Sequence, residues 1–202
     1  MDKIEDLVSK TGEKFGEIIA QSSFDLWQNK DFRNLVNFDS ISQTEQDRIF
    51  NELEVSTLGL FVLNLDNAVQ NSKLDETELF YSKLSKAVIE GFLNLYKKLN
   101  LPQEAISEWR ILIDMRLEEY RKDFKIALKE SEKIKEVKTD PELGALWAKV
   151  ETITIDCLSH IRRGDVKKED PLWRMIRKWL TQLEVILDKL TLQLPIQPPA
   201  ES

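Results

Sequence analysis

The sequence predicts an all-α protein, a multi-helix bundle of about five to six long antiparallel helices around a central apolar helix. Apolar side chains recur at spacings of three and four residues along most of the chain. The 202 residues include only 6 glycines and 6 prolines, and three of these prolines lie in the last eight positions. Because glycine and proline interrupt helices, a body with so few of them predicts long helices joined by short turns.

The first two elements are predicted before residue 40. Helical spacing of apolar residues predicts a helix over residues 3–29. The residues that carry this spacing are Ile4, Leu7, Val8, Phe15, Ile18, Ile19 and Leu26. An aromatic-rich stretch over residues 24–38 predicts a short helix followed by a turn. Its aromatic residues are Phe24, Trp27, Phe32 and Phe38.

The central helix is predicted over residues 42–71. Ser42 stands three residues before Glu45, which fits a capping box, in which the two side chains accept hydrogen bonds from each other's backbone amides. The middle of this helix, near residues 53–69, is apolar on all sides. A helix of this kind is buried on most of its surface, so we expect it at the centre of the bundle.

Two further helices are predicted over residues 75–99 and 102–137. Asp75 is expected as the N-cap of the first of these. Pro102 is favourable at the start of the second, because the first turn of a helix does not use the missing amide. Past Leu128 the apolar pattern of this second helix thins into lysine and glutamate.

The last two helices are predicted over residues 139–163 and 170–194. Asp140 followed by proline is a typical helix start, and Gly164 is a typical residue to end a helix. The final helix carries two adjacent apolar rows. The first row is Leu172, Ile176, Trp179, Leu183, Ile186 and Leu190, and the second is Trp173, Leu180, Leu187 and Leu194. This face is wider than a coiled-coil seam and indicates either ordinary core packing or a surplus face for a partner helix.

The composition predicts one domain in a reducing compartment. Apolar residues make up 42% and charged residues 32% of the chain, which is typical of a globular protein. We expect residues 1–194 to form a single helical-bundle domain and residues 195–202 to form a disordered proline-rich tail. Cys157 is the single cysteine, so no internal disulfide can form. No secretory signal or membrane-spanning run is visible, and the sequence predicts a cytoplasmic protein.

The charge is unevenly distributed along the chain. Residues 1–80 carry 16 acids and 7 bases, net −9, whereas residues 81–202 carry 20 acids and 22 bases, net +2. This excludes a generally basic surface for nucleic acid and leaves only a local one.

A local basic segment spans residues 162–178. Its possible partner-binding residues are Arg162, Arg163, Lys167, Lys168, Trp173, Arg174, Arg177 and Lys178. Bases with interleaved aromatic residues are suited to a phosphate backbone, an anionic surface or an acidic protein. The alternative is a solvated turn beside core tryptophans, or pairing with the acidic first 80 residues.

Few residues are suited to catalysis. His160 is the single histidine, which excludes a ferritin-like di-iron site within one chain. Asp156, Cys157 and His160 share one helix face, but a zinc site would need further ligands, and a buried thiol beside a helix-end histidine is the favoured interpretation. No catalytic residue, metal site or cofactor is therefore predicted, and the chain is more consistent with a non-enzyme.

The segment Phe92-Leu93-Asn94-Leu95-Tyr96-Lys97-Lys98-Leu99-Asn100-Leu101-Pro102, followed by a long amphipathic helix, resembles the region before the C-terminal helix in polyhydroxyalkanoate synthase accessory subunits. The resemblance covers about thirty residues and does not extend to the rest of the chain, so no family is assigned from it.

These observations predict a non-enzymatic helical interaction or scaffold protein that binds a partner protein or itself through apolar helix faces. A first alternative is an accessory protein that binds nucleic acid or an anionic membrane or granule surface through residues 162–178. A second is a small-ligand-binding bundle with a pocket lined by Trp109, Tyr120 and Trp147.

Overall fold

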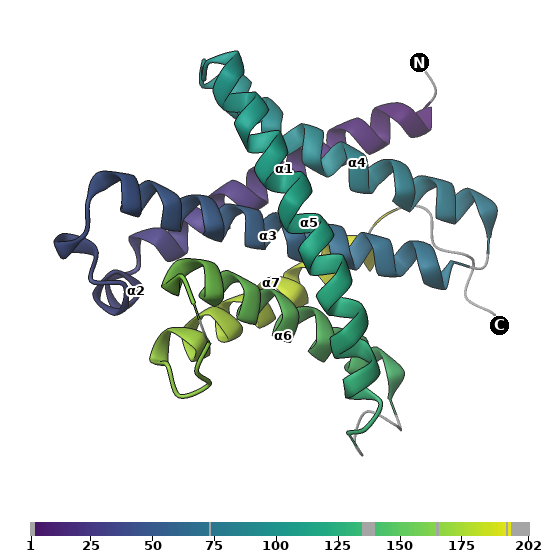
Figure 1. Ribbon diagram of the computed structural model, residues 1–202. Coiled ribbons are helices and arrows are strands. Elements are labelled where there is room, and N and C mark those ends of the chain that lie inside the picture. The colour runs from purple at the N-terminus through teal and green to yellow at the C-terminus, as the bar shows by residue number, and fades with distance from the viewer. Residues whose placement is uncertain (1–2, 73, 135–139, 165, 193, 195–202) are drawn as a thin grey trace.

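A computed structural model describes residues 3–72, 74–134, 140–164, 166–192 and 194. Within these ranges the chain forms helices and no strand, which confirms the predicted all-α bundle (Figure 1). The elements are α1 (Lys3–Gln28), α2 (Lys30–Leu35), the 3-10 turn η1 (Phe38–Ser40), α3 (Gln43–Asn71), α4 (Asp75–Lys98), α5 (Gln103–Ser131), α6 (Pro141–Arg162) and α7 (Pro171–Leu192).

Helix α3 lies at the centre of the bundle. Every residue from Glu52 to Leu65 is buried, and α3 packs against α1, α4, α5, α6 and α7. The prediction of a central apolar helix is therefore confirmed.

The α1–α4 pair is held together by unusually close backbone contact. Gly12 and Gly16 stand one turn apart on α1, facing Ala87 and Gly91 one turn apart on α4. A Cβ atom at Gly12 would lie 2.5 Å from the carbonyl oxygen of Ala87. Small residues at this spacing let two helices approach each other closely, and at the glycine positions of this contact even the methyl group of alanine would clash.

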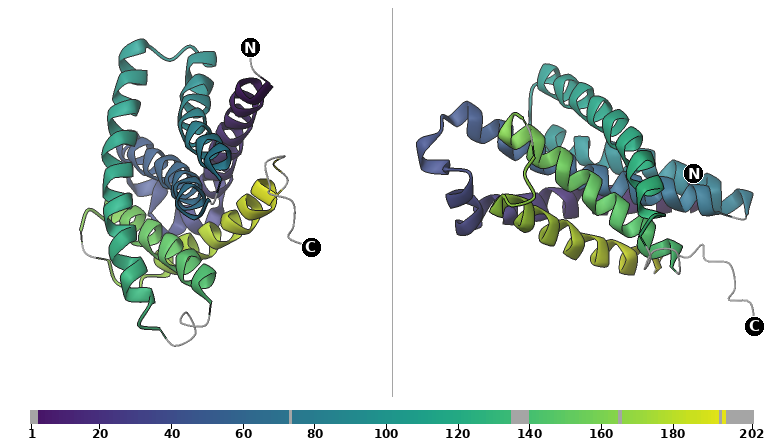
Figure 2. Two further views of the ribbon diagram at one scale, coloured as in Figure 1. Left: turned by 90° about the vertical axis from the view of Figure 1, so that its right-hand side faces the viewer. Right: turned by 60° about the horizontal axis from the view of Figure 1, so that its bottom comes forward.

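The remaining helices cover α3 from other directions. Helix α5 crosses the bundle steeply and packs on α6, α3 and α4 (Figure 1). Helices α6 and α7 form a hairpin, in which α6 packs along α3 and α7 contacts both α2 and α3 (Figure 2).

Predicted helix starts are confirmed at Ser42 and Asp140. The Ser42 hydroxyl accepts a hydrogen bond from the Glu45 amide at 3.3 Å, and the Asp140 carboxylate accepts from the first two available amides of α6. The reciprocal half of the capping box is not formed, because the Glu45 carboxylate binds Arg48 and Arg163 instead.

Two predicted cap residues were wrong, although α4 begins at the predicted Asp75 and α6 ends one residue before the predicted Arg163. Asp75 is the first residue of α4 rather than its cap, and the N-cap position is occupied by Leu74. The left-handed residue after α6 is Arg163, with φ of 55°, and not Gly164. Helix α5 ends at Ser131, where the apolar pattern has thinned and the Ser131 hydroxyl donates to a preceding carbonyl. The predicted limits at residues 137 and 139 and the predicted tail at 195–202 lie outside the described residues.

Candidate functional site

The wide apolar face of α7 is divided between a buried row and a flank. The buried row is Leu172, Ile176, Leu180, Leu183 and Leu187. The flank is formed by Met175, Trp179 and Ile186, and the Ile186 side chain is 46% exposed. The first apolar row predicted from the sequence therefore coincides only in part with the buried row, because its Trp179 and Ile186 lie on the flank.

The flank of α7 faces a hollow of about 490 Å³ between α1 and α7, which we call the α1–α7 groove. Leu26 of α1 and Leu183 of α7 are buried along it. The two helices diverge toward the ends that carry the chain termini (Figure 2, left). Met175 and Trp179 also pack partly against the core, so Ile186 is the most exposed apolar residue of the flank.

Helix α2 closes one end of the groove. The chain leaves α1 at Gln28 and turns at Asn29, whose side chain accepts hydrogen bonds from the amides of Asp31 and Phe32. Because of this cap, α2 begins at Lys30, directly after Asn29. The Phe32 side chain of α2 is buried, and α2 packs against α7. The short second helix predicted from the aromatic stretch therefore sets the separation between α1 and α7.

The two walls of the groove carry opposite charges. Asp25 and Asp31 lie on the wall formed by α1 and α2, and Lys178 lies on the wall formed by α7. All three side chains are exposed, and within the described ranges none of them forms an ion pair. The Asp25 carboxylate accepts one hydrogen bond, from Gln21.

Two arginines of the predicted basic segment, Arg162 and Arg163, form contacts within the chain. The Arg162 guanidinium binds Asp170 at 2.8 Å and donates to the carbonyl of Leu35 at 3.2 Å. Arg163 binds Glu45 at 2.6 Å. These contacts fasten the end of α6 to α2 and α3.

Two more of its bases converge on a buried carboxylate. Lys168 and Arg177 lie 3.6 and 3.5 Å from the Glu151 carboxylate, and Glu151 is only 5% exposed. Arg177 also lies over the Trp173 ring, 5.2 Å from its centroid. The structure therefore gives these bases partners within the chain.

The rest of the basic segment stays available. In the described part of the chain, Lys167, Arg174 and Lys178 contact no carboxylate. Trp173, Arg174, Arg177 and Lys178 come together along a hollow of about 350 Å³ on the outer face of α7. The predicted residues are thus divided between contacts at the end of α6, two bases that pair with the buried Glu151, and this outer face.

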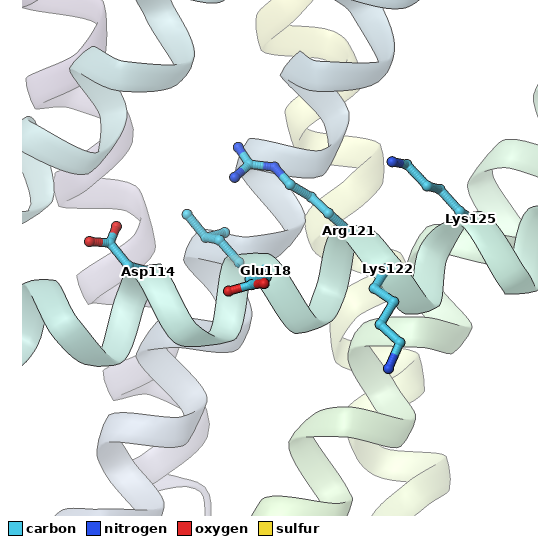
Figure 3. A pocket seen from close by; sticks show the side chains of 6 residues that line it. Asp114, Glu118, Arg121, Lys122 and Lys125 are labelled. Atoms are coloured by element: carbon cyan, nitrogen blue, oxygen red, sulfur yellow. The ribbon is translucent and has the colours of Figure 1, made fainter.

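A third hollow, of about 540 Å³, lies along α5. Its lining runs from acids at Asp114 and Glu118 to bases at Arg121, Lys122 and Lys125 (Figure 3). Figure 3 shows that Lys122 points away from Lys125, and Arg121 is already paired with Asp66 at 2.8 Å. These charged groups do not converge on a common point.

A buried polar group lies between α3, α6 and α7, and it was not predicted from the sequence. Lys149 and Glu184 are 4% and 1% exposed and form an ion pair. The Asn64 amide donates to the same Glu184 oxygen at 2.8 Å. The pKa of Glu184 is raised, because the effect of burial exceeds the lowering by the Lys149 ammonium. Glu184 stands between Leu180 and Leu187 at helical spacing, which was a readable sign of burial.

A second polar group lies where α3, α5 and α6 meet. Arg116 binds the buried Glu52 at 2.7 Å and Glu119 at 3.4 Å, and His160 lies 3.0 Å from Glu119. Asp156 faces the same group. Burial, and after it the nearby carboxylates of α5, raise the pKa of Asp156 to about 7.

A third buried acid lies between α3 and α4. Glu54 is 2% exposed and accepts a hydrogen bond from the Tyr96 hydroxyl. Burial raises the pKa of Glu54 to about 8, although the hydrogen bond from Tyr96 lowers it. Tyr96 in turn stacks on Trp109.

The groups considered for catalysis occupy structural positions. Burial raises the pKa of the Cys157 thiol to about 12, so it is not a thiolate at neutral pH. Within the described ranges, no three histidine, cysteine, aspartate or glutamate side chains are placed to hold a metal ion.

The aromatic residues considered for a ligand pocket are packed. Tyr120 is fully buried and Trp109 is 9% exposed. Neither they nor Trp147 line the three hollows described above.

Comparison of the chain with protein-family models, curated proteins and solved structures gave no match. Across the described residues, every helix is too short or too polar to span a membrane. The function must therefore be argued from the geometry of the chain.

Proposed function

We propose that this chain is a non-enzymatic helical interaction protein that binds a partner protein or a second copy of itself through the α1–α7 groove. The observation that carries the proposal is the flank of α7, where the half-buried Met175 and Trp179 and the exposed Ile186 line the groove. Such a groove, with buried leucines along it and charges on its walls, suits an amphipathic helix.

Two adjacent residues of α7 allow a matched test. Ile186 and Val185 are 46% and 48% exposed, but Ile186 lines the groove and Val185 does not. Affinity purification of Ile186→Glu should lose bound protein that both the parent chain and Val185→Glu retain. Equal recovery with all three chains, or no bound protein with any, would contradict the proposal.

The outer face of α7 supports a second candidate, binding to nucleic acid or to an anionic membrane or granule surface. Among the described residues Arg174 and Lys167 contact no carboxylate, and Trp173 lies beside Arg174 at a hollow. Binding to RNA, DNA or anionic vesicles should then weaken with salt and be lost in Lys167→Glu/Arg174→Glu. Arg162→Glu is the contrasting variant, because this arginine is already occupied by Asp170.

A further inference from the structure

The charges on the walls of the α1–α7 groove indicate what kind of partner binds there. The charged residues that line it are Asp25 and Asp31 on one wall and Lys178 on the other. This matches the whole chain, in which residues 1–80 carry net −9 and residues 81–202 carry net +2. The groove therefore pairs an acidic wall from the first part of the chain with a basic wall from the second.

Opposite charges on opposite walls make the surface complementary to itself. When two identical surfaces meet around a two-fold axis that runs along the groove, the left wall of one copy faces the right wall of the other. Each acidic wall then meets a basic wall, and this contact occurs twice. The half-buried Trp179 and the exposed Ile186 lie between the walls and would meet in the middle of such an interface.

We propose that the α1–α7 groove is the two-fold interface of a homodimer, in which Asp25 and Asp31 of each copy face Lys178 of the other. This inference rests on the proposed interaction function and names its partner as a second copy of this chain. The flank of α7 supplies the apolar centre of the interface, and the charged walls fix its direction.

Sedimentation equilibrium of the full chain over a wide concentration range tests the proposal. The parent chain and Val185→Glu should both reach twice the monomer mass. Ile186→Glu should weaken dimerisation by about a hundredfold or more, because it places two carboxylates in the apolar centre. Since both side chains are already exposed, the variants should fold, and circular dichroism melting checks this directly.

Variants with reversed charges on one wall of the groove test how the two copies are oriented relative to each other. Lys178→Glu alone, and Asp25→Lys/Asp31→Lys alone, should each weaken dimerisation by about tenfold, because each brings like charges together at both contacts. Mixing the two variants should restore a heterodimer, in which every wall again meets its opposite. Failure of the mixed variants to associate would overturn the proposed arrangement.

The outcomes also separate this inference from the proposed function. A parent chain that stays monomeric at all concentrations overturns the homodimer. If Ile186→Glu still loses a bound protein in that case, the interaction function stands and its partner is another protein. If no groove-dependent binding of any kind is found, both proposals fall.

Discussion

Removal of one charge from the buried pair between α6 and α7 should destabilise the fold strongly. In Lys149→Met, the Glu184 carboxylate would remain 1% exposed and keep only the hydrogen bond from Asn64. Breaking a buried ion pair in this way costs about 3–5 kcal/mol of unfolding free energy. For a chain of this size, that corresponds to a fall in melting temperature of about 6–20 °C.

The same substitution at the surface provides the control. Lys10 pairs with Asp6 at 2.7 Å, one turn away on α1, and its side chain is 74% exposed. Because exposed pairs contribute little, Lys10→Met should cost about 0.5 kcal/mol or less. The comparison separates the loss of a buried counter-charge from the general effect of exchanging lysine for methionine.

A double variant completes the test. Lys149→Met/Glu184→Gln removes both charges and keeps an acceptor for Asn64, so it should recover about 2 kcal/mol of the loss. Urea unfolding at neutral pH, followed by circular dichroism, measures each free energy. The reasoning would be refuted if Lys149→Met cost less than about 1 kcal/mol, or if the double variant were no more stable than the single one.

Three further predictions follow from other buried groups. The pKa of Asp156 is raised from 3.8 to about 7, so between these two pH values the folded protein keeps a proton that the unfolded chain releases. The unfolding free energy of the parent chain therefore falls as the pH rises from about 4 to about 7. Asp156→Asn should therefore gain up to about 4 kcal/mol relative to the parent chain between about pH 4 and pH 8 in urea unfolding, and a pH-independent difference would contradict the assignment. Gly12→Ala should cost about 1–3 kcal/mol through its clash with Ala87, whereas Gly164→Ala, with nothing within 4 Å of its Cβ, should leave the melting temperature unchanged. Cys157 should resist iodoacetamide in the folded protein and react after unfolding in urea, because its thiol is buried and its pKa is about 12. Mass spectrometry counts the labelled thiol. Rapid labelling of the folded protein would contradict the prediction and would show that α6 opens locally.

The helices could be predicted from the sequence because their signals are local. Apolar spacing located the long helices, and the Ser42 and Asp140 caps are formed by neighbours within three residues. The signal of Gly12 and Gly16, one turn apart, was also local and was overlooked. Its meaning depends on Ala87 and its neighbours on α4, which supply the matching small surface.

The candidate site could be predicted only in part. The surplus apolar width of α7 was visible, but spacing alone did not show which residues form the flank. The basic segment was visible as well, yet Arg163 pairs with Glu45, 118 positions away, and Lys168 pairs with Glu151 on the preceding helix. A single sequence does not reveal such pairings, because they depend on how the helices are rotated and placed against each other.

The buried ion pair gives a physical reason why α7 keeps its flank exposed. Residues two positions apart on a helix point in nearly opposite directions, about 200° apart, so holding Glu184 against Lys149 and Asn64 turns Ile186 toward the groove. A rotation of α7 that buried Ile186 would leave Lys149 without its counter-charge. Buried polar pairs can fix a unique arrangement at some cost in stability.

This role predicts a specific outcome for an apolar replacement. Lys149→Met/Glu184→Leu removes the charges, and such replacements are often neutral or stabilising by about 1–4 kcal/mol. The variant should therefore stay helical and folded, yet lose groove-dependent association, because α7 is free to rotate its flank into the core. If it associated as the parent chain does, with the same sensitivity to Ile186→Glu, core packing alone would set the rotation of α7, and the ion pair would have no part in forming the groove.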